Sequence, residues 1–290
     1  MTGSRHDAAR GPVVVAGLSH SGKTPLRLAL EASGELTITR KTYLWPRYYA
    51  RFGDLGQPEN LRNCLDAILS DPAIQRLSPD RGRLEEEFSH GSATYTRLFG
   101  LIHSQHAAGN GTTRWGEQLG GAERFADLIL DEYPDASFVH MIRDPRDRMS
   151  FIGRRPGVIG WETEKWLDSA RRAHANLNNH PGRYHLFRYE DLAADPESAL
   201  RSICELVDLG FRERMLIALR AGLDSKANPQ ELGGRQRAYI SRRAHHQLVA
   251  FGYGSTVSHD RGDTGRMPIE TVGAAARRWA VRLPNNTVED

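Results

Sequence analysis

Near its start the chain reads Val13-Val14-Val15-Ala16-Gly17-Leu18-Ser19-His20-Ser21-Gly22-Lys23-Thr24, an apolar run followed by a glycine-bounded turn. The glycines and the final Lys-Thr pair match the spacing G-x-x-x-x-G-K-[ST] of a phosphate-binding loop. In such a loop, glycines let successive backbone N–H groups converge on one anion, and the following helix adds its partly positive N-terminus. The stretch therefore predicts a strand, a phosphate-binding turn and a helix.

The residues after this loop favour a helix that ends near Gly34. Pro25 fits its first turn, because backbone N–H groups there have no intrahelical partner. The apolar positions are Leu26, Leu28, Ala29 and Leu30. A glycine just beyond them is a common helix terminator.

Strands and helices alternate along much of the remaining chain. Residues 137–142 and 184–189 are predicted strands, and Asp195 followed by Pro196 is typical of a helix start. Such alternation predicts a three-layer α/β/α fold with a central parallel sheet. Residues 35–106 mix aromatic side chains with arginines and show no clear period.

Composition narrows the functional classes. The net charge of +3, from 39 basic and 36 acidic residues, is too balanced for a nucleic-acid binder that works by phosphate neutralisation. We find no apolar run long enough for a transmembrane segment and no apolar signal-peptide core in residues 1–10. We therefore expect a cytoplasmic protein. Cys64 and Cys204 lack metal-ligand spacing and are interpreted as ordinary thiols.

A second phosphate site is predicted after the strand at 137–142. There the chain reads Arg143-Asp144-Pro145-Arg146-Asp147-Arg148-Met149-Ser150. Ligands of parallel sheets lie at the carboxyl edge of the strands, so Arg143 and Ser150 are candidates to hold a phosphate. Two phosphate sites on one sheet suggest a nucleotide that is phosphorylated at both ends.

Several motifs, in their order along the chain, resemble those of the sulfotransferases that use 3′-phosphoadenosine 5′-phosphosulfate. They are residues 17–24, Arg143-Asp144-Pro145 through Ser150, and Arg188-Tyr189-Glu190-Asp191-Leu192. Trp115-Gly116-Glu117 also resembles a segment of that family. Each motif is short, and their ordered combination is more specific than any one of them.

The resemblance implies a role for each matching residue. The loop would hold the 5′-phosphosulfate of the donor, Arg143 and Ser150 its 3′-phosphate, and Tyr189 would lie near the adenine. The implied loop contacts are Ser19, His20, Ser21, Gly22, Lys23 and Thr24. Lys23 and His20 are the candidates for stabilising transition-state charge, and Glu117 is the candidate base. Family members resemble the P-loop nucleotide kinases in fold, with a single α/β domain around a central parallel sheet. They transfer a sulfuryl group to a hydroxyl or amine and generally need no metal.

The sequence departs from the family pattern at four places. His20 stands where a lysine or arginine is usual, and Lys23 where a hydroxyl residue is usual. The interval from Arg143 to Ser150 is seven residues, where the family more often has eight. Gln118 replaces a lysine that commonly follows the Trp-Gly-Glu segment. The loop's positive charge is therefore expected at residue 23 rather than residue 20.

We expect a sulfotransferase-like α/β domain over residues 11–254. A flexible N-terminus, residues 1–10, would precede it, and a polar C-terminal extension with one further helix, residues 255–290, would follow. The acceptor would be a small molecule, a lipid or a glycan-like compound, recognised by residues 35–115. Neither its identity nor the oligomeric state is readable from the sequence.

Two other functions remain open. A P-loop kinase or NTPase that uses ATP or GTP is favoured by Lys23, and it would need an acidic magnesium ligand. Asp131 and Glu132 follow an apolar run, but we interpret them as residues at the end of a helix. The third reading is a non-catalytic nucleotide-binding protein.

Overall fold

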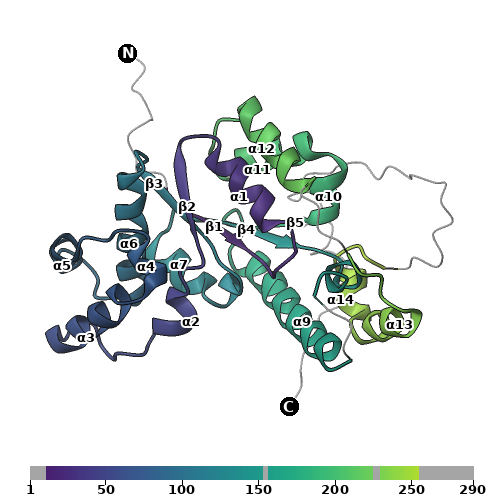
Figure 1. Cartoon of the computed structure of the whole chain (residues 1–290), viewed down its shortest axis with the longest axis horizontal. Coiled ribbons are helices and arrows are strands. Elements are labelled where there is room, and N and C mark those ends of the chain that lie inside the picture. Colours follow the sequence, from purple (N-terminus) through teal and green to yellow (C-terminus); the bar gives the residue numbers. More distant parts are fainter. Residues whose placement is uncertain (1–10, 153–155, 225–228, 255–290) are drawn as a thin grey trace.

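The protein is built around one five-stranded sheet whose strands are all parallel (Figure 1). The structure, a computed structural model, describes residues 11–152, 156–224 and 229–254. The strand order is β2-β3-β1-β4-β5. Its strands are β1 (Val13–Ala16), β2 (Leu36–Arg40), β3 (Arg114–Gln118), β4 (Ser137–Ile142) and β5 (Tyr184–Arg188).

Helices precede, follow and connect these strands. They are α1 (Lys23–Glu31), α2 (Leu44–Tyr48), α3 (Pro58–Leu69), α4 (Pro72–Gln75), α5 (Arg81–Ser89), α6 (Tyr95–Gly109), α7 (Ala126–Glu132), α8 (Pro145–Met149), α9 (Pro156–Asn179), α10 (Tyr189–Ala194), α11 (Pro196–Leu206), α12 (Glu213–Leu223), α13 (Gly234–Arg243) and α14 (His245–Ala250), with a short 3₁₀ helix, η1 (Ala122–Arg124).

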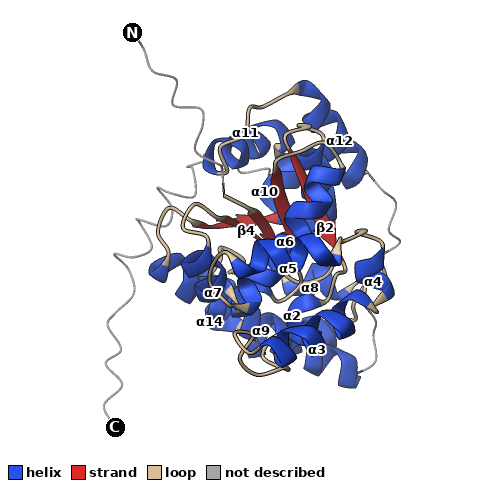
Figure 2. Ribbon diagram, turned by 90° about the vertical axis from the view of Figure 1, so that its left-hand side faces the viewer, coloured by secondary structure: helices blue, strands red, loops and turns tan. Residues whose placement is uncertain are grey.

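Helices cover both faces of the sheet, because the side chains of β1 point alternately into two different apolar clusters. Val13 and Val15 pack in one apolar cluster with residues of α1, α11 and α12. Val14 and Ala16 pack in another with residues of α6, α7 and α9. Figures 1 and 2 show these two helical layers on opposite sides of the strands. The predicted three-layer α/β/α fold is thus confirmed.

The predicted element boundaries largely agree with the structure. The strands at 13–16 and 137–142 form as predicted, and the Asp195 carboxylate accepts the Ser198 N–H at 3.1 Å, capping α11. The strand predicted over 184–189 is one residue too long, because Tyr189 already begins α10. Asp131 and Glu132 are the last residues of α7, as interpreted.

The segment without a readable period, residues 35–106, folds into β2 and the helices α2 to α6. Figure 1 shows these helices gathered beside the β2 and β3 end of the sheet. The predicted N-terminal and C-terminal segments, 1–10 and 255–290, lie outside the described residues. Among the helices that the structure describes, none is both long and apolar enough to cross a membrane.

Candidate active site

The phosphate-binding loop follows the carboxyl end of β1, and its two glycines have positive φ angles. A Cβ atom at Gly17 would lie 2.1 Å from the backbone oxygen of Met141. At Gly22 it would lie 2.7 Å from Cδ2 of the Tyr189 ring. Both positions therefore exclude a larger side chain, so the loop runs close to β4 on one side and to α10 on the other.

His20, at the tip of the loop, has a left-handed backbone with φ of 63°. That conformation costs a non-glycine residue about 1–2 kcal/mol. Its ring stacks on Phe151, with centroids 5.5 Å apart and planes 12° apart. Partial burial, and then the charges of Arg148 and Arg143, lower the pKa of His20 below its usual value. The imidazole is therefore mostly neutral at pH 7 and supplies no fixed charge to the loop.

Two arginines from the segment after β4 hold the loop by its carbonyl groups. Arg148 donates from Nε to the Ser19 oxygen at 2.8 Å, and Arg143 from Nη1 to the His20 oxygen at 3.2 Å. Ser21 closes the turn by donating from Oγ to the Leu18 oxygen at 2.7 Å. These bonds offset the strain at His20, since hydrogen bonds from charged donors contribute about 1.5–3 kcal/mol.

Arg143 lies between two aromatic rings. Its guanidinium carbon is 3.9 Å from the ring centroid of Tyr189 and 4.7 Å from that of Phe151. The Trp166 indole on α9 fixes the backbone of this residue by donating to the Arg143 oxygen at 2.9 Å. The structure therefore brings together three predicted features, namely the loop, Arg143 and Tyr189.

Ser150 caps the C-terminal end of α8, and its Oγ donates to the Asp147 backbone oxygen at 2.6 Å. The eighth residue after Arg143 is Phe151, and its ring contacts the guanidinium. The shorter interval thus places an aromatic ring at the position where the family more often has a serine. The role of Ser150 as a phosphate ligand stays a prediction.

Lys23 begins α1 and its side chain is only 8% exposed. Burial lowers the pKa of its ammonium to about 8, with Glu123 opposing and Arg148 adding to the decrease. A Cβ atom at Gly120 would lie 3.4 Å from Nζ, so the lysine extends toward the end of β3. A partly desolvated ammonium has much to gain from an anionic ligand.

Thr24 and Gln118 belong to a small cluster of hydrogen-bonded side chains on the α1 side of the sheet. The Gln118 amide donates to the Thr24 hydroxyl at 3.4 Å, and its oxygen accepts from Arg27 Nε at 3.1 Å. Arg27 also forms an ion pair with Glu31. A cation on α1 therefore reaches the position where the family commonly has a lysine.

Glu117 lies on the opposite face of β3 and is 2% exposed. One carboxylate oxygen accepts from the Thr42 hydroxyl and the other from the Trp45 indole at 3.1 Å. His103 Nε2 lies 3.5 Å from the second oxygen. Burial alone would raise the pKa of Glu117, but the charge of His103 and these hydrogen bonds together lower it. The structure does not bring Glu117 into the group around the loop, and its role as a base stays a prediction.

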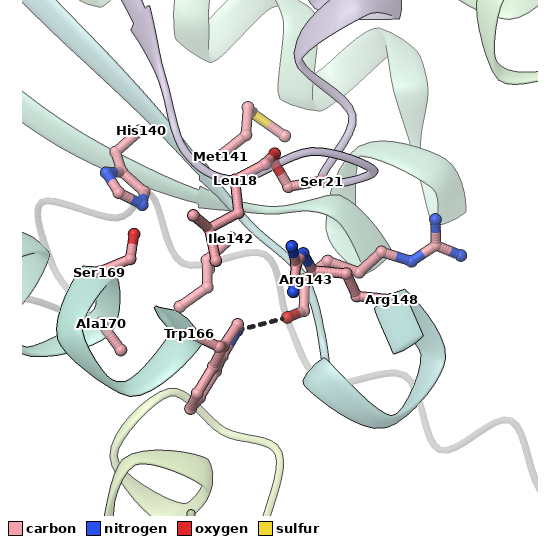
Figure 3. A pocket seen from close by; sticks show the side chains of 10 residues that line it. All are labelled: Leu18, Ser21, His140, Met141, Ile142, Arg143, Arg148, Trp166, Ser169 and Ala170. Atoms are coloured by element: carbon pink, nitrogen blue, oxygen red, sulfur yellow. Dashed lines mark hydrogen bonds between the residues drawn. The ribbon is translucent and has the colours of Figure 1, made fainter. Parts of the chain in front are cut away.

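A small cavity of about 10 Å³ lies behind the loop, with room for about one water molecule (Figure 3). Leu18 and Ser21 line it from the loop, and Trp166 and Ser169 from α9. Among the described residues, Arg148 Nη1, Arg143 Nε and Ser169 Oγ have no hydrogen-bond partner. Their residues all line this cavity, so its surroundings suit one ordered water rather than an organic ligand.

Residues 12–213 match the protein family described as the sulfotransferase family. The chain belongs to this family. The matched range includes the loop, both arginines and Tyr189, and it ends at the first residue of α12.

Known sulfotransferases share sequence and fold with the chain. It is 28% identical over 151 residues to the omega-hydroxy-beta-dihydromenaquinone-9 sulfotransferase Stf3 of Mycobacterium bovis, covering 43% of the chain and 38% of that relative. It is 24% identical over 174 residues to carbohydrate sulfotransferase 5 of Mus musculus, covering 51% and 44%. The chain thus spans less than half the length of these curated relatives.

A solved sulfotransferase, STF9 from Mycobacterium avium, superposes with a TM-score of 0.50. The sequence identity is 13%, and the superposition covers 84% of this chain and 77% of the other. This likeness supports the sulfotransferase fold.

Sequence reasoning missed Arg148 and Glu162. Arg148 is fully buried beneath the loop and donates from Nη2 to Glu162 Oε2 at 2.6 Å. Nothing in the basic stretch 143–155 distinguishes Arg148 from its neighbours. A buried ion pair was therefore not readable there.

Proposed function

We propose that the chain transfers the sulfuryl group of 3′-phosphoadenosine 5′-phosphosulfate to a hydroxyl or amine of an acceptor. The observation that carries this proposal is the meeting of the loop, Arg143 and Tyr189 at the carboxyl ends of β1, β4 and β5. Family membership supports the reaction class.

In this proposal the donor lies along the edge of the sheet. The 5′-phosphosulfate would meet the loop, whose ligand groups are Ser19, His20, Ser21, Gly22, Lys23 and Thr24. Arg143 and Ser150 would take the 3′-phosphate, and Tyr189 would lie near the adenine. Because Arg143 also bonds to the loop, it would link the sites for the two ends of the donor.

The reaction exchanges one bond for another. The acceptor oxygen or nitrogen attacks sulfur, and the bond from sulfur to the bridging phosphate oxygen breaks. The electron pair leaves on the 5′-phosphate of adenosine 3′,5′-bisphosphate, and the acceptor proton passes to a base, for which Glu117 is our candidate. Lys23 would oppose the negative charge that develops on the leaving phosphate.

In this proposal, residues 35–115 recognise the acceptor. One relative is named for a hydroxylated dihydromenaquinone and another for a carbohydrate. These names support a lipid or glycan-like acceptor, and a small molecule is the third class we propose. The helices α2 to α6, beside β2 and β3, would form this side of the site.

Calorimetry tests the donor. Adenosine 3′,5′-bisphosphate should bind without added metal, whereas ATP should bind weakly with or without magnesium. A ligand at a hundredfold excess over Kd stabilises the native state by about 2.7 kcal/mol, so a rise in melting temperature is a second readout. Magnesium-dependent binding of ATP, with none of the bisphosphate, would instead establish a kinase or NTPase.

Sulfuryl transfer itself tests the activity. Purified protein should transfer labelled sulfate from the donor to members of a panel of hydroxylated lipids, glycans and small phenols. Tight bisphosphate binding with no transfer to any member of such a panel would favour a non-catalytic nucleotide-binding protein.

A further inference from the structure

Arg148 is the most deeply buried cation near the loop, with 0% of its surface exposed. It cannot touch a bound nucleotide without a rearrangement of α8. Its guanidinium instead contacts Ser19 twice, from Nε to the backbone oxygen at 2.8 Å and from Nη2 to the side-chain oxygen at 3.3 Å. Arg148 can therefore affect a ligand through its contacts with the loop, or through its charge, which already lowers the pKa of His20 and of Lys23.

The contact with the Ser19 carbonyl fixes the orientation of a peptide plane. In a trans peptide the C=O and the following N–H point in opposite directions. Since the Ser19 oxygen faces the Arg148 guanidinium, the His20 N–H points away from that guanidinium. Arg143 orients the next peptide in the same way, through the His20 oxygen at 3.2 Å. The two arginines thus select the loop conformation that holds His20 at its left-handed φ.

Arg148 is itself held from the far side. Glu162 on α9 accepts from Nη2 at 2.6 Å, and Lys165 contacts the other oxygen of Glu162 at 3.1 Å. The guanidinium therefore bridges α9 and the loop as a planar fork. A lysine cannot reproduce this bridge, because a single ammonium offers no rigid pair of donors.

We propose that Arg148, anchored by Glu162, is a positioning residue that presets the loop's peptide groups for the 5′-phosphate end of the donor. This inference rests on the proposed function, since it assumes that the loop binds that phosphate. Arg148 would then contribute to the affinity for the donor without touching it.

The test compares two ligands in each variant. Adenosine 3′,5′-bisphosphate carries the 5′-phosphate, and adenosine 3′-monophosphate lacks it. Arg148→Met should weaken the bisphosphate by about 10- to 100-fold, the equivalent of one charge-assisted hydrogen bond. The affinity for the monophosphate should change less than about twofold. The ratio of the two affinities removes any general effect on folding.

A matched control is available in Arg114, which is 5% exposed and donates to the Gly11 and Val207 backbone oxygens at 2.7 Å each. Arg114→Met also removes a buried arginine from backbone carbonyls, but away from the loop. It should lower the melting temperature and leave the ratio of the two affinities unchanged.

Glu162→Gln keeps the shape of the anchor and removes its charge. It should reduce the bisphosphate affinity less than Arg148→Met and with the same selectivity, and it decides the matter if Arg148→Met does not fold. Unchanged ratios in the folded Arg148 and Glu162 variants, or equal losses for both ligands, would overturn the inference. A higher bisphosphate affinity in Glu162→Gln would overturn it too, because an effect of the Arg148 charge alone predicts that gain. If the wild-type protein binds no bisphosphate, the proposed function has failed instead.

Discussion

The two sides of the sheet's carboxyl edge are organised differently. Beyond β1, β4 and β5, Arg143 and Arg148 donate to loop carbonyls, and the buried Lys23 side chain lies beside the loop. Near the carboxyl end of β3, the buried Glu117 carboxylate accepts hydrogen bonds from Thr42 and Trp45, and His103 Nε2 lies 3.5 Å away. The first side resembles a site prepared for an anion, and the second resembles a closed structural network.

This difference shows what a buried charge can be used for. A buried carboxylate surrounded by donors is stable and needs nothing more. A buried ammonium such as Lys23, with a pKa lowered by burial, is more stable when an anion arrives. The Lys23 ammonium is therefore stabilised by an anionic ligand, and the Glu117 carboxylate is not.

The strongest test of this contrast is Lys23→Met. If the ammonium opposes charge that develops on the leaving phosphate, its loss should reduce single-turnover sulfuryl transfer by about 10²- to 10³-fold, or about 2.7–4 kcal/mol. Donor affinity, measured by calorimetry, should fall much less. His20→Ala is the companion variant, and its turnover should stay near that of the wild type because the imidazole is mostly neutral.

Near-normal turnover in Lys23→Met together with an inactive His20→Ala would reverse the assignment within the loop. Equal losses of binding and turnover in both variants would show that the loop only anchors the donor.

Next in size is the effect of Arg143→Ala. The variant should weaken adenosine 3′,5′-bisphosphate by about 10- to 100-fold, as expected for one arginine–phosphate contact. An adenosine nucleotide without the 3′-phosphate should lose far less. Equal losses for the two ligands would mean that Arg143 acts only through its bond to the loop. Ser150→Ala, measured in the same way, tests the serine after the shortened interval.

Glu117→Gln probes the other side of the comparison. Loss of the charge from a buried carboxylate with two hydrogen-bond donors and His103 3.5 Å away should lower the free energy of unfolding by about 2 kcal/mol. Because the folded-state pKa of Glu117 is lowered, its contribution is present above the unfolded-state pKa and is lost as pH falls through the folded-state value.

Urea denaturation at neutral and acidic pH measures this stability. Turnover of the same variant tests the assignment of Glu117 as the base. Full turnover after Glu117→Gln would remove that assignment, and unchanged stability would contradict the network.

The smallest expected effect is the pH dependence of the affinity for the donor. Burial places the pKa of Lys23 at about 8 in the free protein, and a bound phosphate should raise it. Affinity should therefore be full below pH 8 and decrease above it, by at most about tenfold per pH unit. Calorimetry between pH 7 and pH 9 measures the slope. The same titration of Lys23→Met should be flatter, and equal slopes would assign the effect to another group.

Sequence could predict the positions of those parts of the candidate site that directly follow a strand. The loop, Arg143 and Tyr189 each follow a strand directly, so the parallel sheet brings them to one edge. The partners of Arg148 were not predictable, because Ser19 lies 129 residues away and Glu162 lies on the next helix. Only the packing of α8 against the loop reveals that contact.

The burial of Glu117 could not be predicted from the sequence, for a different reason. Its hydrogen-bond donors, Thr42 and Trp45, lie in or beside α2, within the segment that showed no period. A short helix begun by a residue with positive φ, here Tyr43, leaves little trace in an apolar pattern. The sequence therefore made Glu117 a candidate base, which stays a prediction, and did not indicate its surroundings.

Helix α9 has a consequence for protein engineering. Glu162 and Trp166, one turn apart on this helix, hold the side chain of Arg148 and the backbone of Arg143. A graft of residues 13–34 into another scaffold would carry the glycines and the lysine without these supports. The smallest unit that keeps the loop and these supports therefore extends from β1 into the first half of α9, and a designer who copies the loop must copy its distant scaffold as well.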